Sequence, residues 1–217
     1  MVKQFVVLGA GRFGTSVAIK LVDLGAEVMI VDNDDAVVQS LADKVTYAVK
    51  ADVTQEAALN ALGLRNFDTA IVTIGGDIKS STLVTLMLKE MGIKNIIAKA
   101  QDKLHAKVLY KIGADRVVFP EKEMGIRIAK NLMASNVMDF IELSDHYSMV
   151  EVNPLESWIG KSIQQIDVRR SYGLNIVGIK KGKDMKINLM PDYVIERGDI
   201  LIVIGNNQDL KEIENKE

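Results

Sequence analysis

The first residues whose types and spacing suggest ligand binding form a glycine-rich segment near the start of the chain. Gly9, Gly11 and Gly14 follow an apolar run, residues 5–8, and an apolar-periodic segment comes next. A strand, a Gly-x-Gly-x-x-Gly turn and a helix in this order are the context that the dinucleotide-binding motif requires. Gly9 allows a tight turn, Gly11 lets the backbone approach a pyrophosphate, and Gly14 lets the helix pack closely on the strand. The spacing therefore predicts an anion site at the N-terminus of the helix.

A carboxylate follows the second apolar run. Residues 27–31 are strand-like, and Asp32 comes directly after them. An acidic side chain at this strand end hydrogen-bonds the ribose hydroxyls of a bound nucleotide. The same charge repels a 2′-phosphate, so we expect NADP to bind poorly. Together the two features favour a nucleotide site over a glycine turn that serves only as a loop.

Two further segments belong to the same predicted crevice. Arg12 lies inside the glycine turn, where a guanidinium suits terminal phosphates because it can bind two oxygens at once and is always charged. The alternative is an arginine that is merely solvated at the turn. A second turn, Gly75-Gly76-Asp77, follows the buried-type strand over residues 69–74 and is expected to line the same edge of the sheet.

The elements that must position these residues alternate regularly. We predict strands over 5–8, 27–31, 45–49, 69–74, 96–98 and 116–119, and helices over 15–24, from 34, over 52–62, over 77–91 and over 102–112. Such alternation is typical of a doubly wound parallel sheet with helices on both faces. The predicted fold class is therefore α/β, with a Rossmann-like nucleotide-binding domain first.

At Pro120 the pattern changes. Proline followed by acidic residues in the first turn starts a helix, which we expect to run to about Ser135. Its apolar residues fall on two faces, one with Met124, Ile128 and Leu132 and one with Ile126, Ala129 and Met133. Either two protomers share this helix, or it is the buried sixth helix of a monomer.

From Asp139 onward the predicted elements become short. We expect strands over 140–143, 148–152, 175–180, 185–188 and 200–204, a hairpin turn over 181–184, a helix over 162–166 and a terminal helix from 207. This is a small α+β, βαβββα-like domain. We therefore expect two domains, a Rossmann-like one with its crossover helix over 1–137 and a second over 138–217.

Composition bounds the class of protein. The chain has 217 residues, a formal net charge of −2 and no cysteine. The lack of cysteine excludes a thiol nucleophile and a Cys-based zinc site. No apolar run reaches the ~18 residues of a membrane span, and the N-terminal residues lead straight into a strand, so we expect a cytoplasmic protein without a signal peptide. The balanced charge argues against nucleic acid as a partner.

The candidate general acids and bases are few. His105 and His146 are the two histidines of the chain, and we expect each to be a surface or capping residue rather than a catalyst. The sequence has no Gly-x-x-x-x-Gly-Lys-Ser/Thr loop for phosphoryl transfer. We therefore interpret the chain as a ligand-gated regulator and not an enzyme. The alternative is a small NAD(H)-linked oxidoreductase or redox sensor.

Several short segments carry a resemblance to a known family. Segments 9–14, 51–54, 65–68, 99–101, 112–115 and 120–125 resemble the RCK (TrkA-N) domain of KtrA proteins, and the tail, with Val168-Arg169, Tyr172-Gly173 and Gly198-Asp199, is similar to the RCK-C (TrkA-C) domain. The resemblance covers essentially the whole chain. It implies a cytosolic regulatory subunit, peripheral at the inner face of the membrane. Such subunits form homodimers and homo-octameric rings beneath a potassium-transporting membrane subunit that ATP activates and ADP inactivates.

The resemblance also implies roles for individual residues. It places ATP or ADP, ahead of NAD(H), on Gly9, Gly11, Arg12, Phe13, Gly14, Asp32, Asp52, Thr73, Gly75 and Lys99. It places Glu121 at the dimer seam near the phosphates. Two anions brought together there repel each other unless a cation lies between them, so Mg²⁺ or Ca²⁺ is expected with Glu121 and its symmetry mate as ligands.

The C-terminal domain is implied to bind a second ligand. Taken without the resemblance, the residue types of this domain indicate only a small apolar core, with Arg170 exposed to solvent. The resemblance implies instead that cyclic di-AMP binds at a dimer interface and inhibits transport, through Ile163, Asp167, Arg169, Asn175, Ile176 and Pro191. A two-fold symmetric ligand suits an interface between identical domains. Asp184, an acid in the nearby hairpin, weighs against phosphate binding.

Overall fold

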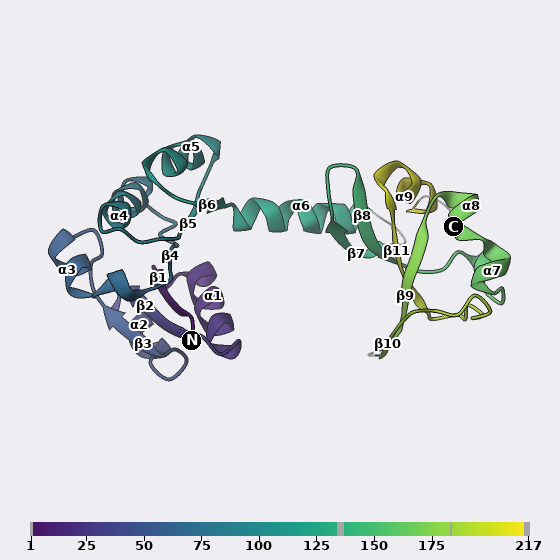
Figure 1. Cartoon of the computed structure of the whole chain (residues 1–217), viewed down its shortest axis with the longest axis horizontal. Helices are drawn as coiled ribbons and strands as arrows, with labels where there is room; N and C mark the ends of the chain where they lie inside the picture. The colour runs from purple at the N-terminus through teal and green to yellow at the C-terminus, as the bar shows by residue number, and fades with distance from the viewer. Residues whose placement is uncertain (1, 134–136, 183, 215–217) are drawn as a thin grey trace. The chain divides into compact units, whose positions relative to one another are not determined.

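The computed structural model describes residues 2–133, 137–182 and 184–214. The chain divides into two compact units, Met1–Lys122 and Glu123–Glu217, and each contains one sheet (Figure 1). The predicted end of the long helix at Ser135, the hairpin residue Lys183 and the last three residues lie outside the described residues. Among the described residues, no helix is long and apolar enough to cross a bilayer.

The first unit is built on a parallel sheet with the strand order β3-β2-β1-β4-β5-β6. Its strands are β1 (Gln4–Leu8), β2 (Glu27–Asp32), β3 (Tyr47–Lys50), β4 (Thr69–Val72), β5 (Ile96–Lys99) and β6 (Arg116–Val118). The chain reverses its direction of travel across the sheet between β1 and β4. In open α/β sheets this switch point is where ligands bind. The predicted doubly wound fold is confirmed.

Helices cover both faces of this sheet, as the alternation of β1 side chains requires. The helices are α1 (Arg12–Asp23), α2 (Asp35–Leu41), α3 (Glu56–Ala61), α4 (Ile78–Glu90) and α5 (Lys103–Ile112). Leu8 of β1 belongs to one buried cluster, with Leu59, Val84 and Leu109 of α3, α4 and α5. Val7, the residue before Leu8, belongs to a second buried cluster, which contains Ala18 of α1 and Leu41 of α2.

Two helix starts differ from the prediction. Helix α1 begins at Arg12, not Thr15, because the glycine turn leads directly into it with Gly11 as the N-cap. Helix α3 begins at Glu56, not Asp52. The carboxylate of Asp52 accepts hydrogen bonds from the backbone N–H and the hydroxyl of Thr54, at 3.0 and 2.6 Å. This Asx turn precedes the helix rather than capping it.

Helix α6 (Pro120–Met133) follows β6 and begins at the predicted proline. Met124, Ile126, Ile128 and Leu132 are between 47% and 81% exposed, whereas the side chain of Met133 lies outside what the structure describes. The boundary between the two units falls inside α6, so the exposure within one unit decides neither interpretation. A helix shared between two protomers and the buried sixth helix of a monomer both stay predictions.

The second unit has an antiparallel sheet in the order β10-β9-β11-β8-β7. Its elements are β7 (Val137–Glu142), β8 (Tyr147–Val152), α7 (Ile163–Ile166), α8 (Val168–Tyr172), β9 (Asn175–Lys181), β10 (Asp184–Ile187), β11 (Ile200–Asn206) and α9 (Asn207–Glu214). The predicted α+β class is confirmed. Helix α8 was not predicted. It has five residues and starts after Asp167, whose φ of 47° separates it from α7.

Candidate functional site

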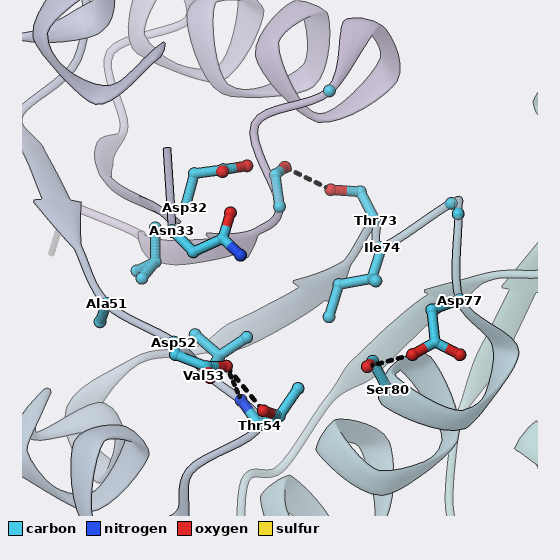
Figure 2. A pocket seen from close by; sticks show the side chains of 15 residues that line it. Asp32, Asn33, Ala51, Asp52, Val53, Thr54, Thr73, Ile74, Asp77 and Ser80 are labelled. Atoms are coloured by element: carbon cyan, nitrogen blue, oxygen red, sulfur yellow. Dashed lines mark hydrogen bonds between the residues drawn. The ribbon is translucent and has the colours of Figure 1, made fainter. Parts of the chain in front are cut away.

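A cleft of about 420 Å³ opens where the carboxyl ends of β1, β2, β3 and β4 meet the start of α4 (Figure 2). It lies at the switch point of the parallel sheet, where the fold is expected to bind ligands. The predicted nucleotide-binding residues that line it are Gly9, Gly11, Asp32, Asp52, Thr73 and Gly75. The sheet therefore brings together six residues that span 67 positions of sequence, from 9 to 75.

The glycine turn is held from two sides. The Thr73 hydroxyl donates to the Gly9 carbonyl at 2.6 Å, which Figure 2 draws as a dashed line. A Cβ added at Gly14 would overlap both the Gly9 carbonyl oxygen and Thr73 Oγ1. The start of α1 therefore approaches the turn as closely as only glycine permits. Phe13 is half-buried beside it, outside the cleft lining.

Asp32 fixes the turn from the β2 side. Its Oδ2 accepts the backbone N–H of Ala10 at 2.6 Å, and its Oδ1 accepts that of Asp34 at 3.0 Å. An ionised carboxylate can accept about four hydrogen bonds, so the two ribose hydroxyls of a nucleotide still have sites on it. Asn33 lines the cleft next to Asp32.

Two more carboxylates, those of Asp52 and Asp77, line the cleft (Figure 2). Asp77 accepts hydrogen bonds from the Ser80 hydroxyl at 2.6 Å and the Lys79 N–H at 2.9 Å. The Ser80 hydrogen bond, ahead of the Lys79 one, lowers the pKa of Asp77, and the Thr54 hydroxyl does the same for the pKa of Asp52. Both groups are ionised at neutral pH. Phosphates are therefore favoured at the N–H groups that open α1 rather than next to these two carboxylates.

A charged cluster lies next to the cleft and not in its lining. Lys99 Nζ is 2.5 Å from Glu121 Oε1, and a Cβ on Gly75 would lie 3.2 Å from the same nitrogen. The Lys99 hydrogen bond is the main cause that lowers the pKa of Glu121, and the charge of Arg12 adds to it. Arg12, Lys99 and Glu121 are thus near one another beside the turns that line the cleft.

Glu121 therefore has a protein cation as its partner within one chain. Among the described residues of a single chain, no cluster of three or more acidic or histidine side chains has the arrangement of a metal site.

Several lining residues were not predicted individually. Asn33, Thr54 and Ser80 all line the cleft. Asn33 comes two residues after the predicted strand end at Val31, and a search of the residues just beyond the parallel strands would have found it. Ser80 lies in the first turn of α4, three residues after the capping Asp77, a spacing that was visible in the sequence.

His105 was predicted to be a surface or capping residue, and it does not lie at the surface. It is 2% exposed, because α5 turns it to the same face as Ala106 and Leu109. This burial lowers its pKa, partly offset by the charge of Asp102. The expectation for His146 is met, since it is exposed.

In the second unit, two pairs of the predicted cyclic di-AMP residues come together. Arg169 Nε donates to Asn175 Oδ1 at 2.7 Å. The N–H of Gln164, next to Ile163, donates to the Pro191 carbonyl at 2.8 Å. Ile176 is half-buried in β9, Asp167 separates α7 from α8, and Asp184 is exposed opposite Lys181 in the hairpin.

Comparison with known proteins decides the family. The TrkA-N domain matches residues 5–120 and the TrkA-C domain matches residues 147–216. The chain belongs to the KtrA/TrkA-type RCK family. Ktr system potassium uptake proteins C and A of Bacillus subtilis (strain 168) are each 45% identical to this RCK chain, over 100% and 99% of it and over 98% and 96% of their own lengths.

Two solved structures of the protein GsuK share the fold. The crystal structure of the GsuK RCK domain superposes on 99% of this RCK chain and 47% of its own, with a TM-score of 0.68 at 18% identity. GsuK bound to ADP covers 60% of this chain and 33% of its own, with a TM-score of 0.51 at 26% identity. The KtrA RCK C domain in complex with cyclic diadenosine monophosphate is 44% identical over 32% of this chain and 81% of its own, with a TM-score of 0.30.

Proposed function

We propose that this chain is the cytosolic, nucleotide-sensing regulatory subunit of a Ktr-type potassium uptake system. Two full-length relatives bear the name of that system, and both RCK domains are present in their order. The subunit acts on a potassium-transporting membrane protein, at the inner face of the membrane, as a homo-octameric ring of homodimers. The exposed apolar residues of α6, Met124, Ile126, Ile128 and Leu132, supply a surface that a second protomer would cover.

ATP and ADP are the proposed ligands of the cleft, with ATP activating transport and ADP inactivating it. The observation that carries this proposal is the bond between Asp32 and the Ala10 N–H, because it holds the ribose-binding carboxylate against the phosphate-binding turn. Arg12 and Lys99, both next to Glu121, are positioned for terminal phosphates. The RCK protein GsuK, 26% identical, has been solved with ADP.

The two nucleotides must favour different states of the ring, because a ligand shifts an equilibrium only through its different affinities for the two states. We propose that the terminal phosphate of ATP competes with Glu121 for Lys99 and Arg12. The released Glu121 carboxylate and its symmetry mate would then be free to hold Mg²⁺ or Ca²⁺, whose charge would offset the repulsion between the carboxylates and the phosphates.

The second unit is proposed to bind cyclic di-AMP and thereby to inhibit transport. Arg169 keeps its terminal guanidinium nitrogens for a phosphate, since its Nε is the atom bonded to Asn175. Ile163 and Pro191, brought near each other by the Gln164–Pro191 bond, offer apolar contact to a base. Asp184 is exposed, so solvent and salt screen its repulsion of the ligand.

Two measurements test the proposed function. Potassium uptake in cells that lack the protein should return when the wild-type chain is supplied. Calorimetry on the purified full chain should then show binding of ATP and ADP and weaker binding of NADH. Tight NADH binding without ATP or ADP binding would support the oxidoreductase or redox-sensor alternative instead.

A further inference from the structure

Gln101 connects the cleft to a buried histidine. It follows β5, and its side-chain amide donates to the carbonyl of Gly75, which lines the cleft. Its backbone N–H donates to Nδ1 of His105 at 3.3 Å. One residue therefore holds the second turn of the cleft with its side chain and contacts the histidine ring with its main chain.

The state of the His105 ring follows from that contact. A nitrogen that accepts a hydrogen bond carries no proton, so the ring is neutral and its proton is on Nε2. Nε2 is buried and has no hydrogen-bond partner among the described residues. The backbone N–H of His105 donates to Asp102 Oδ1 at 2.8 Å, which caps α5 and holds the residue in place. A second proton, on Nδ1, would face the Gln101 N–H donor directly.

We propose that His105 is a positioning residue for the nucleotide cleft, and that protonation of its ring weakens nucleotide binding by displacing Gln101 from the Gly75 turn. This inference rests on the proposed nucleotide binding. The protonated ring repels the Gln101 N–H, so the main chain at Gln101 shifts and its side chain leaves the Gly75 carbonyl. The turn that closes one side of the cleft then loses its tether.

The surroundings of His105 determine the pH range over which its ring is protonated. Burial lowers its pKa, and the Asp102 carboxylate, on the cap of the same helix, acts in the opposite direction with a smaller effect. Helix α4 and strand β6 pack against α5. The charged residues of these two elements and of the α4 N-cap are exposed: Asp77, Lys79, Lys89, Glu90 and Arg116. Protonation therefore occurs below the ordinary histidine value of about 6.5.

The direction of the effect follows by linkage. Nucleotide binding stabilises the tethered Gly75 turn and hence the neutral ring, so the bound state holds the proton less tightly than the free state. Affinity is full above the pKa of His105 in the free protein and falls as the pH drops through it. The energy at stake is that of about one hydrogen bond, equivalent to about a threefold change in affinity.

The chain offers a matched control, because it has two histidines. Calorimetry with ADP on the full chain, between about pH 7.5 and 5.5, should compare wild type, His105→Asn and His146→Asn. Asparagine keeps an acceptor near the Nδ1 position but does not titrate. Wild type and His146→Asn should lose about threefold more affinity than His105→Asn over this range. The titration of ADP itself is common to all three proteins and cancels.

A second measurement separates this inference from the nucleotide proposal. In hydrogen exchange without ligand, the segment 73–80 should exchange faster in wild type than in His105→Asn at the lower pH and equally at the higher pH. Gln101→Ala, at an exposed side chain, should exchange fast at both. This pattern without ADP binding would contradict the nucleotide proposal and leave the His105–Gln101 link standing. Equal exchange in wild type and His105→Asn at the lower pH would overturn the inference, even if ADP binds.

Discussion

The hydroxyl of Thr73 and the carbonyl of Gly9 are joined by a 2.6 Å hydrogen bond, although the two residues are 64 positions apart. Thr73 is 5% exposed, and its backbone N–H also donates to the Leu8 carbonyl at 2.8 Å. The end of β4 therefore holds the glycine turn that follows β1 by both main chain and side chain. This places the phosphate-binding part of the cleft on a rigid support.

Replacing Thr73 by valine keeps the side-chain volume and leaves the Gly9 carbonyl without this donor. We expect a loss of about 1 kcal/mol in the free energy of unfolding of the N-terminal unit and a lower affinity for ADP. Chemical denaturation and calorimetry would measure the two effects. Thr85→Val is the matched control, because the buried Thr85 hydroxyl donates to a carbonyl of its own helix at 2.8 Å. An equal loss of ADP affinity in both variants would contradict the assigned role of Thr73.

Arg12→Ala should abolish the discrimination between ATP and ADP while the fold stays intact. The guanidinium is exposed beside the glycine turn, so its removal costs no core packing, and it takes away a charge suited to a terminal phosphate. Calorimetry with both nucleotides measures the ratio of affinities. Arg65→Ala, at another exposed arginine of the same unit, should leave the ratio unchanged. A ratio preserved in Arg12→Ala would count against this assignment.

Glu121→Gln should remove the dependence of ATP activation on Mg²⁺, because the amide cannot act as an anionic ligand. Potassium flux in reconstituted vesicles, with ATP and increasing Mg²⁺, tests this. Glu123→Gln, two residues along α6, is the control and should respond to Mg²⁺ as the wild type does. Unaltered Mg²⁺ dependence in Glu121→Gln would place the metal elsewhere.

The lowered pKa of Glu121 also predicts how the stability of the fold depends on pH. Because the Lys99 hydrogen bond lowers the pKa of Glu121, the folded carboxylate binds a proton more weakly than the unfolded one. The pair therefore adds stability above about pH 4.3 that is lost as the pH falls through the lowered folded value. The effect is small, since the Glu121 side chain is 70% exposed. Glu121→Gln should flatten this part of the acid denaturation profile.

Arg169→Ala should weaken cyclic di-AMP binding about tenfold or more, because a charge-assisted phosphate contact is lost. Arg170→Ala, at the next and equally exposed residue, is the control. Titration of the full chain with cyclic di-AMP measures both. A flat isotherm for the wild type would overturn the proposed second ligand, and equal affinities of the two variants would remove Arg169 from the site.

The sequence predicts the parts of the fold that depend on local chemistry. The glycine turn and the starts of α2, α4 and α5, at Asp34, Asp77 and Asp102, lie where the pattern indicates. The start of α3 was misplaced because an aspartate that accepts an N–H two residues ahead occurs both in helix caps and in turns. Asp52 has that bond in a turn, and the sequence does not distinguish the two cases.

Contacts between side chains that are far apart in the sequence could not be predicted from it. The pairs Lys99–Glu121, Gln101–Gly75 and Arg169–Asn175 depend on strand register and rotamers that periodicity does not specify. The burial of His105 depends on which face α5 turns to the sheet. Resemblance to a family named several of these residues but gave no partners for them.

The most direct test of the central claim is ADP binding by the full-length wild type and by Asp32→Asn, measured by calorimetry at neutral pH. Asp35→Asn, at an exposed residue that pairs with Lys50 at 3.4 Å, controls for the loss of one negative charge. The account predicts that wild type and Asp35→Asn bind ADP alike and that Asp32→Asn binds it about tenfold or more weakly, because a charged acceptor for the ribose is lost. Equal binding by all three proteins, or no binding by the wild type, would contradict it.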